Sequence, residues 1–256
     1  MSILKEITNS RRKNLPNKKD FINVSVEKND RDFIKALKSQ RNDKKNLIAE
    51  VKRKSPSKGE IRPDANIIKV IDWYKPYASA ISVLTEPNYF GGSLNDLKQA
   101  AQLCSLPLLR KDFLTDPIQV KEARINHANA YLLIVGALTK NQLQELIECG
   151  KEWNIPALVE VHNEKELEVA LDCDIEILGI NNRDLTNLTI NLSTTQRLLD
   201  LIPQKLKEKF VLISESGIEN KKDVLSLPNQ IDAILVGTSI MKSQDPIAQL
   251  KNLTEI

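Results

Sequence analysis

The 256-residue sequence predicts an α/β protein, a (β/α)8 or TIM barrel with an N-terminal helical extension. Eight short apolar runs rich in Ile, Leu and Val follow one another after residue 46, and stretches with helical periodicity separate them. Such runs are typical of strands buried on both faces, as parallel sheets require. Their number and their mean repeat of about 27 residues match the strand count and length of this barrel.

The extension comes first in the chain. It is polar and rich in lysine, and two weak helical patterns occur in it, around Ile3, Leu4 and Ile7 and around Phe33, Ile34 and Leu37. We therefore expect residues 1–46 to add helices to the barrel. No linker rich in Gly, Pro or Ser divides the chain, so residues 1–256 are expected to form a single domain.

The predicted strands are each bounded by turn-forming residues. In chain order they are Leu47–Val51, Ala80–Leu84, Pro107–Leu109, Tyr131–Val135, Ala157–Val161, Ile175–Ile180, Phe210–Ile213 and Ile231–Val236. Helices are expected between them, one beginning after the N-cap residue Ser93 and another after Thr139 and ending at Gly150. Further helices are expected to begin near Asn66, Pro117, Glu164, Ser193, Lys221 and Gln244.

A doubly wound sheet is the alternative fold for alternating strands and helices. Nucleotide-binding sheets of that type carry a glycine-rich turn after the first strand, with the pattern GxGxxG or GxxxxGK[ST]. The sequence contains neither pattern, and Lys54–Gly59 resembles the second only superficially. The barrel is therefore the favoured prediction.

Charge and composition exclude several classes of partner. Lys and Arg number 37 and Asp and Glu 34, a net charge of +3, and aromatic residues make up 4% of the chain. Binding of single-stranded nucleic acid needs a basic groove lined with rings, so nucleic acid is not an expected partner. No apolar run approaches the 18 residues of a membrane span, and the N-terminus lacks the apolar core of a signal peptide. We expect a cytoplasmic protein, a monomer or weak homo-oligomer, with no membrane partner.

Cysteine and histidine are too sparse for a metal centre. The three cysteines form no CxxC pair, and the two histidines, His127 and His162, have no HExxH spacing. Neither a disulfide framework nor a bound metal is expected.

Polar residues gather where the predicted strands end, which is where a barrel of this type builds its substrate site. Glu50 and Lys52 follow the first strand, Lys111 the third, Glu160 the fifth and Asn181 the sixth. Side chains two residues apart on a strand share a face, so all five are predicted to point into the barrel mouth. Charges buried together there must pair with one another. The neighbouring Arg53, Lys54, Arg110 and Asp112 have the outward parity and are expected to be ordinary solvated charges.

Small residues follow the last two strands. Ser216 and Gly217 come after the seventh strand, and Gly237 comes after the eighth. In many barrels these two loops bind a phosphate through backbone N–H groups and the N-terminus of a short helix. The two loops together predict a phosphate site.

These strand-end motifs resemble those of the indole-3-glycerol-phosphate synthase family. The motifs are Ile48–Gly59, Leu109–Phe113, Leu158–His162, Gly179–Leu185 and Ser214–Ile218, with Asp32–Leu37 in the extension. The resemblance implies a barrel with helices over its mouth that acts in tryptophan biosynthesis. It also implies conversion of 1-(2-carboxyphenylamino)-1-deoxyribulose 5-phosphate to indole-3-glycerol phosphate with release of CO2 and water, without metal or organic cofactor.

Roles for individual residues follow from the same resemblance. Lys111 would be the principal general acid and Glu160 a catalytic acid or base, with Lys52 and Glu50 as partners in the proton network. Asn181 would be a catalytic residue, and together with Arg183 it would hold the anthranilate end of the substrate. The remaining substrate-binding residues would be Phe113 and, around the phosphate, Ser55, Ser216, Gly217 and Gly237. The eighth strand departs from the family pattern at Thr238, a position that is often Ser or Glu.

Two other functions remain compatible with these residues. One is a phosphosugar aldolase that uses Lys111 or Lys52 as a Schiff-base nucleophile. The other is a catalytically silent barrel that serves as a scaffold, for which degraded strand ends would be expected. The division of proton transfers between the two lysines is also left open by the sequence.

Overall fold

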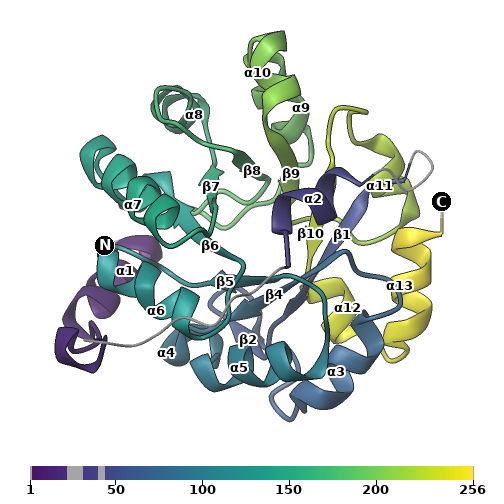
Figure 1. The fold of residues 1–256 in the computed structure, drawn as a ribbon. Helices are drawn as coiled ribbons and strands as arrows, with labels where there is room; N and C mark the ends of the chain where they lie inside the picture. The colour runs from purple at the N-terminus through teal and green to yellow at the C-terminus, as the bar shows by residue number, and fades with distance from the viewer. Residues whose placement is uncertain (1, 22–30, 40–43, 256) are drawn as a thin grey trace.

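A computed structural model describes residues 2–21, 31–39 and 44–255, and its centre is a closed barrel of eight parallel strands (Figure 1). The strands are β1 (Asn46–Val51), β4 (Ala80–Leu84), β5 (Leu108–Lys111), β6 (Ala130–Ile134), β7 (Ala157–Val161), β8 (Ile177–Asn181), β9 (Val211–Glu215) and β10 (Ala233–Val236). Strand β1 closes the barrel by pairing with both β4 and β10. The predicted TIM barrel is confirmed.

Helices surround the barrel and begin close to the predicted positions (Figure 1). The longer ones are α3 (Ile67–Tyr74), α5 (Leu94–Leu103), α6 (Pro117–Ile125), α7 (Lys140–Glu152), α8 (Glu164–Leu171), α9 (Ser193–Asp200) and α13 (Pro246–Thr254). Side-chain caps explain the starts of all of these except α9: for α5, Ser93 Oγ accepts from the backbone N–H of Asp96 at 3.1 Å. Across the described ranges, no helix is long and apolar enough to cross a membrane.

Short elements fill the loops. They are the hairpin strands β2 (Lys54–Ser55) and β3 (Gly59–Glu60), the helices α4 (Pro87–Phe90), α10 (Gln204–Lys209), α11 (Lys221–Ser226) and α12 (Thr238–Lys242), and the 3-10 turns η1 (Lys18–Phe21) and η2 (Val135–Ala137). The hairpin and α4 lie in the loops after β1 and β4, and α12 follows β10. They therefore contribute to the wall around the barrel mouth.

Helix α7 does not end at Gly150 as predicted but continues to Glu152. The turn is made instead by Asn154, whose φ is 53°. Gly150 is needed for packing, because a Cβ there would overlap the hydroxyl of Tyr131. That hydroxyl donates a hydrogen bond to the carbonyl oxygen of Leu146 at 2.6 Å and so ties β6 to α7.

Alternate strand positions build two separate cores. One set, which includes Leu47, Ala49 and Val51 of β1, packs between the strands and the outer helices. The other set points inward and fills the barrel, with Ile48, Leu109, Leu158, Ile213 and Leu235 among its members. The inward set fixes the direction of the residues two positions further along each strand.

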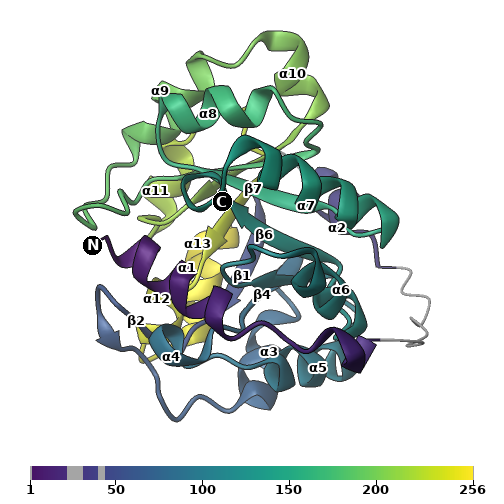
Figure 2. The same cartoon turned by 90° about the vertical axis from the view of Figure 1, so that its left-hand side faces the viewer.

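The two N-terminal helices lie toward opposite ends of the barrel (Figure 2). Helix α2 (Phe33–Lys38) buries Phe33 and Leu37 in the inner core, at the end where β1 begins. Helix α1 (Ile3–Lys13) lies over the other end, where Arg11 Nη2 pairs with Asp112 Oδ2 at 2.9 Å. The extension over the mouth that the resemblance implies is therefore α1, whereas α2 closes the opposite end.

Candidate active site

Five polar side chains meet at the carboxyl ends of the strands. Glu50, Lys111, Glu160, Asn181 and Glu215 come from β1, β5, β7, β8 and β9. The predicted third, sixth and seventh strands ended one or two residues too early, because these polar residues remain in the hydrogen-bonded sheet. Asn181, for example, is in register with Glu215 on the neighbouring strand. The sheet itself holds these side chains in place.

Lys111 is the centre of this group. Its Nζ lies 2.9 Å from Glu160 Oε2 and 2.9 Å from Glu215 Oε2. Asn181 Nδ2 donates to the other oxygen of Glu160, Oε1, at 3.1 Å. All four residues are buried, and the charged groups among them pair with one another as predicted for inward-facing charges. The structure thus brings together Lys111, Glu160 and Asn181 as predicted.

A second pair occupies the neighbouring sector of the mouth. Lys52 Nζ forms an ion pair with Glu50 Oε1, and Ser82 Oγ lies 3.5 Å from Glu50 Oε2. Gly237 leaves the space that the side chain of Glu50 occupies, because a Cβ at residue 237 would lie 2.7 Å from Glu50 Oε1 and 2.9 Å from the Cβ of Glu50. The glycine at the end of β10 is therefore required by a carboxylate, a role that its prediction as a phosphate-binding residue did not include.

Glu215 is the residue that the sequence analysis missed. In the segment Ser214–Ile218 the sequence predicts phosphate binding by Ser216 and Gly217, and no role is predicted for Glu215 between Ser214 and Ser216. Its signal was available, since Ile213 faces the inner core and Glu215 stands two residues further along the same strand. Lys111 stands in the same relation to Leu109, an inner-core residue of β5.

The buried charges shift one another's pKa values. Burial alone would lower the pKa of Lys111, but the carboxylates of Glu160, Glu215 and Glu50 raise it above its ordinary value. Burial favours the neutral form of Glu160, yet Lys111 and His162 hold its pKa well below the usual range. For Glu215, burial and the repulsion of Glu160 outweigh Lys111 and raise the pKa to about 8. Near neutral pH the cluster therefore has an ammonium, a carboxylate and a carboxylic acid, which are the forms that acid–base chemistry needs.

Three of the four charges of outward parity are not solvated, contrary to the prediction, whereas the ammonium of Lys54 stays at the surface, where it donates to the carbonyl oxygen of Asn88 at 2.6 Å. Arg110 is fully buried, and its guanidinium binds Glu122 Oε2 at 2.7 Å and the carbonyl oxygen of Gln119 at 2.8 Å. Arg53 makes a bidentate pair with Asp96 at 2.6 and 2.9 Å. Asp112 is also buried and joins the Arg110 network at 3.2 Å. These residues fasten the loops from outside the barrel, because their strands turn them away from the mouth.

A cavity of about 180 Å³ opens above the Lys111 cluster. A smaller one of about 80 Å³ adjoins it beneath α1 and is lined by Ile3, Leu4 and Ile7 of that helix. Lys52, Phe113 and Arg183 border both cavities. Phe113 packs against Phe90, with ring centroids 5.8 Å apart. A charged cavity thus leads into an apolar one that can accept a flat ring.

The predicted phosphate residues are spread around this mouth. Ser216, Gly217 and Gly237 line the larger cavity. Ser216 and Gly217 have φ values of 66° and 82°, so the loop after β9 turns sharply here. Ser55 lines the smaller cavity instead, and its buried Oγ has no hydrogen-bond partner among the described residues. A buried hydroxyl of this kind is available to a ligand.

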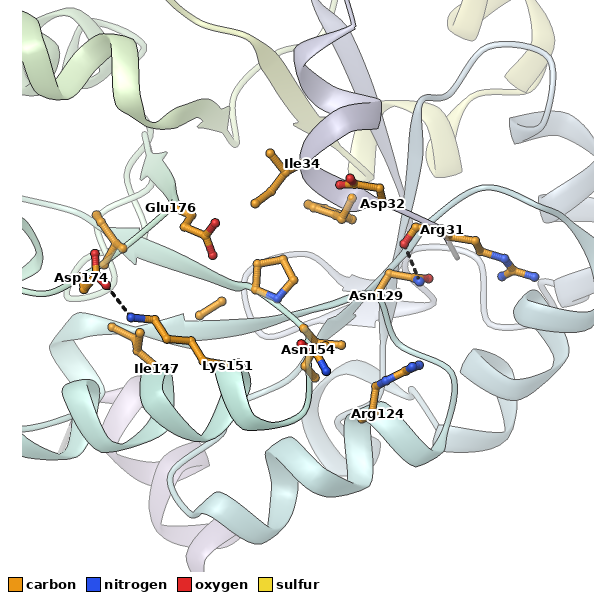
Figure 3. Close-up of a pocket in the computed structure, with 15 residues that line it drawn as sticks. Arg31, Asp32, Ile34, Arg124, Asn129, Ile147, Lys151, Asn154, Asp174 and Glu176 are labelled. Carbon is orange, nitrogen blue, oxygen red and sulfur yellow. Dashed lines mark hydrogen bonds and ion pairs between the residues drawn. The ribbon is translucent and has the colours of Figure 1, made fainter. Parts of the chain in front are cut away.

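A larger cavity, of about 440 Å³, lies at the opposite end of the barrel (Figure 3). Polar groups of its lining bind one another: Lys151 Nζ pairs with Asp174 Oδ2 at 2.5 Å, and Asn129 Nδ2 donates to the carbonyl oxygen of Arg31 at 3.0 Å. This end of a barrel contributes stability, whereas substrates bind at the carboxyl ends of the strands. We therefore place the active site at the mouth. Over the residues described, no cluster of three or more His, Cys, Asp or Glu side chains could hold a metal ion.

Comparisons with known proteins identify the family. The family model for indole-3-glycerol phosphate synthase matches residues 4–253. The synthase of Dehalococcoides mccartyi is 46% identical over 212 residues, 81% of this chain and 80% of that protein. The synthase of Petrotoga mobilis is 42% identical over 210 residues, 81% of this chain and 83% of that protein. A multifunctional tryptophan biosynthesis protein of Schizosaccharomyces pombe is 39% identical over 243 residues, 92% of this chain but 31% of its own length.

Solved structures show the same fold at low sequence identity. KGPDC from Streptococcus mutans superposes with a TM-score of 0.59 at 12% identity, covering 82% of this chain and 95% of that one. The 3-hexulose-6-phosphate synthase from Salmonella typhimurium gives 0.58 at 14% identity, covering 81% and 96%. These likenesses concern the barrel alone. The family match over almost the whole chain, and relatives more than 40% identical, show that this chain belongs to the indole-3-glycerol phosphate synthase family.

Proposed function

We propose that this chain, an indole-3-glycerol phosphate synthase of tryptophan biosynthesis, performs its ring closure at the cluster of Lys111, Glu160 and Glu215. The substrate would be 1-(2-carboxyphenylamino)-1-deoxyribulose 5-phosphate. The observation that carries this proposal is the position of Lys111 Nζ, 2.9 Å from each carboxylate and at the floor of the mouth cavity.

Ring closure forms a bond between the carboxylate-bearing carbon of the aromatic ring and the ketone carbon of the sugar. The ketone oxygen must gain a proton as this bond forms, and Lys111 is assigned as the donor. Glu215, protonated near neutral pH, can then return a proton to the lysine amine across their hydrogen bond. Loss of CO2 from the same ring carbon leaves its bonding electrons in the ring and restores aromaticity.

Dehydration completes the indole. The hydroxyl formed from the ketone leaves as water, for which an acid must protonate it, and a base removes a proton from the adjacent carbon. Lys52, paired with Glu50, is assigned as this acid, and Glu160, held as a carboxylate, as the base. Lys52 directly follows β1, Glu160 lies on β7, and both line the same cavity.

Substrate binding would use both cavities. Arg183 and Asn181 suit the anthranilate carboxylate, and Phe113 with the apolar cavity under α1 suits the ring. Ser55, Ser216, Gly217 and Gly237 are proposed to surround the phosphate, by their small size and their place after β1, β9 and β10. The absence of a cofactor, the cytoplasmic location, the single domain and the monomer or weak homo-oligomer stay predictions.

The Schiff-base alternative is less well supported. A lysine nucleophile must be neutral, whereas the surrounding carboxylates raise the pKa of Lys111 and stabilise its ammonium. The scaffold alternative predicts degraded strand ends, whereas six polar residues are paired here: Glu50, Lys52, Lys111, Glu160, Asn181 and Glu215.

Turnover of the proposed substrate is the direct test. The purified protein is incubated with the carboxyphenylamino-deoxyribulose phosphate, and formation of the indole ring is followed by fluorescence. We expect turnover without added metal or cofactor. Absence of product from a folded sample would refute the proposal.

A further inference from the structure

A histidine and a second glutamate lie behind the proposed base Glu160. His162 Nε2 is 3.1 Å from Glu160 Oε1, and His162 Nδ1 is 2.8 Å from Glu166 Oε2. The side chains of His162 and Glu160 are 6% and 3% exposed, so water screens this contact poorly. A chain of three titratable groups therefore runs from the start of α8 to the floor of the active site.

Local structure fixes the far end of this chain. Asn163 caps α8, its Oδ1 accepting from the backbone N–H of Glu166 at 3.0 Å and its Nδ2 donating to Glu166 Oε1 at 3.0 Å. Glu166 Oε2 also accepts from the backbone N–H of His162 at 3.0 Å. On its other side Gly136 leaves room, because a Cβ there would lie 2.9 Å from Glu166 Oε1. The carboxylate of Glu166 is thus held in place at several points.

We infer that His162 and Glu166 are positioning residues of the catalytic reaction: Glu166 keeps His162 as an imidazolium, and the imidazolium keeps Glu160 a carboxylate while Lys111 gives up its proton. This inference rests on the proposed function. Lys111 loses its charge when it protonates the ketone, and Glu160 would then be a buried carboxylate with a neutral neighbour. A second cation on the other oxygen of Glu160 removes that problem.

The surrounding charges agree with this assignment. Burial disfavours a charged imidazole, but the close ion-pair contact with Glu160 and the hydrogen bond and charge of Glu166 raise the pKa of His162 to about 10. Asp184, in the loop after β8, also interacts with His162, and Lys111 and Glu215 face Glu160 from β5 and β9. Asn181, the remaining partner of Glu160, carries no charge. Glu160 thus has cationic neighbours on two sides, Lys111 and His162.

The protonation of His162 can be measured without turnover. The chain has 2 histidines, so the imidazole resonances of labelled protein are few, and His127→Gln assigns them. In the wild type we expect the His162 signal to stay that of an imidazolium up to pH 8. In Glu166→Gln and in Glu160→Gln its midpoint should fall by about one pH unit or more, because each variant removes one counter-ion. Glu168→Gln, two residues further on the exposed face of α8, should leave it unchanged.

The catalytic consequence is measured in the pH dependence of kcat. By linkage, loss of the imidazolium raises the pKa of Glu160 as much as loss of the Glu160 charge lowers that of His162. In His162→Gln the acid limb should therefore move up by about one pH unit, with about tenfold lower kcat below it. Glu166→Gln should move the acid limb in the same direction. If His162→Gln does not fold, Glu166→Gln is the variant that tests the inference.

Three outcomes would overturn the inference. They are a wild-type His162 that is neutral at pH 7, a midpoint unaffected by Glu166→Gln and Glu160→Gln, and variants that lose stability while their acid limb stays in place. If the wild type does not turn over the substrate, the proposed function fails, but the histidine titration still decides whether His162 is held as an imidazolium.

Discussion

The Cα of Gly179 faces the carboxylate of Glu215, so closely that a Cβ on residue 179 would overlap Glu215 Oε1. The two residues lie on adjacent strands, and Glu215 in turn is hydrogen-bonded to Lys111. A glycine within β8 weakens the strand, since it has no side chain to pack. Here it provides the space that a buried carboxylate needs beside the proposed general acid.

Gly179→Ala should therefore impair catalysis more than stability. The added methyl group would overlap Glu215 Oε1, and Leu158 Cδ2, 2.7 Å away on the other side, prevents the methyl group from moving aside. Glu215 must therefore rotate away from Lys111. We expect kcat to fall by about 10²-fold, at the lower end of the range for loss of acid–base catalysis, with a small change in KM. Steady-state kinetics and thermal unfolding of the variant test this. Normal kcat would mean that Glu215 can move without consequence.

Glycines at the mouth should separate binding from catalysis. Gly237→Ala places a methyl group against Glu50, so we expect kcat to fall as the Glu50–Lys52 pair is displaced. Gly217→Ala meets Ile190 instead, at 2.5 Å from its Cγ2, and should mainly raise KM by changing the loop proposed to bind phosphate. Kinetic constants of the two variants, measured side by side, give the comparison.

The control for Gly217→Ala is Gly59→Ala. Gly59 has φ 62° and open space around its Cα, whereas Gly217 has φ 82° and close neighbours. Both substitutions carry a backbone cost of about 1 kcal/mol or more, which appears in the free energy of unfolding. Only Gly217→Ala should change KM. Equal KM values in the two variants would argue against a phosphate at the β9 loop.

Glu215 should also make stability depend on pH. Its pKa is raised from the ordinary value of 4.5 to about 8, so between these values the folded state binds more protons at this site than the unfolded state. This contribution is present below pH 4.5 and is lost as pH rises towards 8. From pH 5 to pH 8 the free energy of unfolding of the wild type should therefore fall relative to that of Glu215→Gln.

Urea unfolding at several pH values measures this difference. Exposed Glu208→Gln is the matched control, and its difference from the wild type should be independent of pH in this window. If Glu215→Gln behaves like that control, Glu215 is ionised throughout and cannot return a proton to Lys111.

The sequence was sufficient for the barrel because its evidence is local. Each strand is an apolar run, and most of the longer helices begin at a capping residue, as at Ser93 and Thr139. The inward parity of Glu50, Lys111, Glu160 and Asn181 followed from the period of a strand. Contacts between distant segments were beyond that evidence. The prediction that a helix ends at Gly150 failed because the glycine there makes room for Tyr131 of another element. The prediction that Arg110 is solvated failed because Arg110 pairs with Glu122 of the following helix.

Glu215 and His162 illustrate the same limit within the site. Both lie two residues beyond inward-facing positions, yet each gains its role from a partner on another element, Lys111 on β5 and Glu166 on α8. Strand parity predicts where a side chain points, but the identity of the group that it meets depends on how the strands are staggered around the barrel.

Replacement of Lys111 by methionine tests the central assignment. Methionine is unbranched and fills similar space but cannot donate a proton. As a general acid Lys111 should contribute about 10²–10⁴-fold to the rate, or about 3–5 kcal/mol of barrier. We therefore expect a loss of kcat in or above that range for Lys111→Met, with a smaller change in KM, since Arg183 and the phosphate loops are unaltered. The variant should be compared by circular dichroism as well, because it leaves Glu160 and Glu215 without their shared cation.

A Schiff base would give the same kinetic loss, so the covalent route needs its own test on the wild-type enzyme. An imine between Lys111 Nζ and the substrate ketone would be reduced by borohydride to a stable secondary amine, whereas proton donation leaves no covalent trace. Formation of that imine requires a neutral amine in the resting enzyme, whereas Glu160, a carboxylate 2.9 Å from Nζ, stabilises the ammonium before substrate reacts. Mass spectrometry after borohydride treatment with substrate should therefore show unmodified protein. An adduct mapped to Lys111 would assign the lysine as a nucleophile instead.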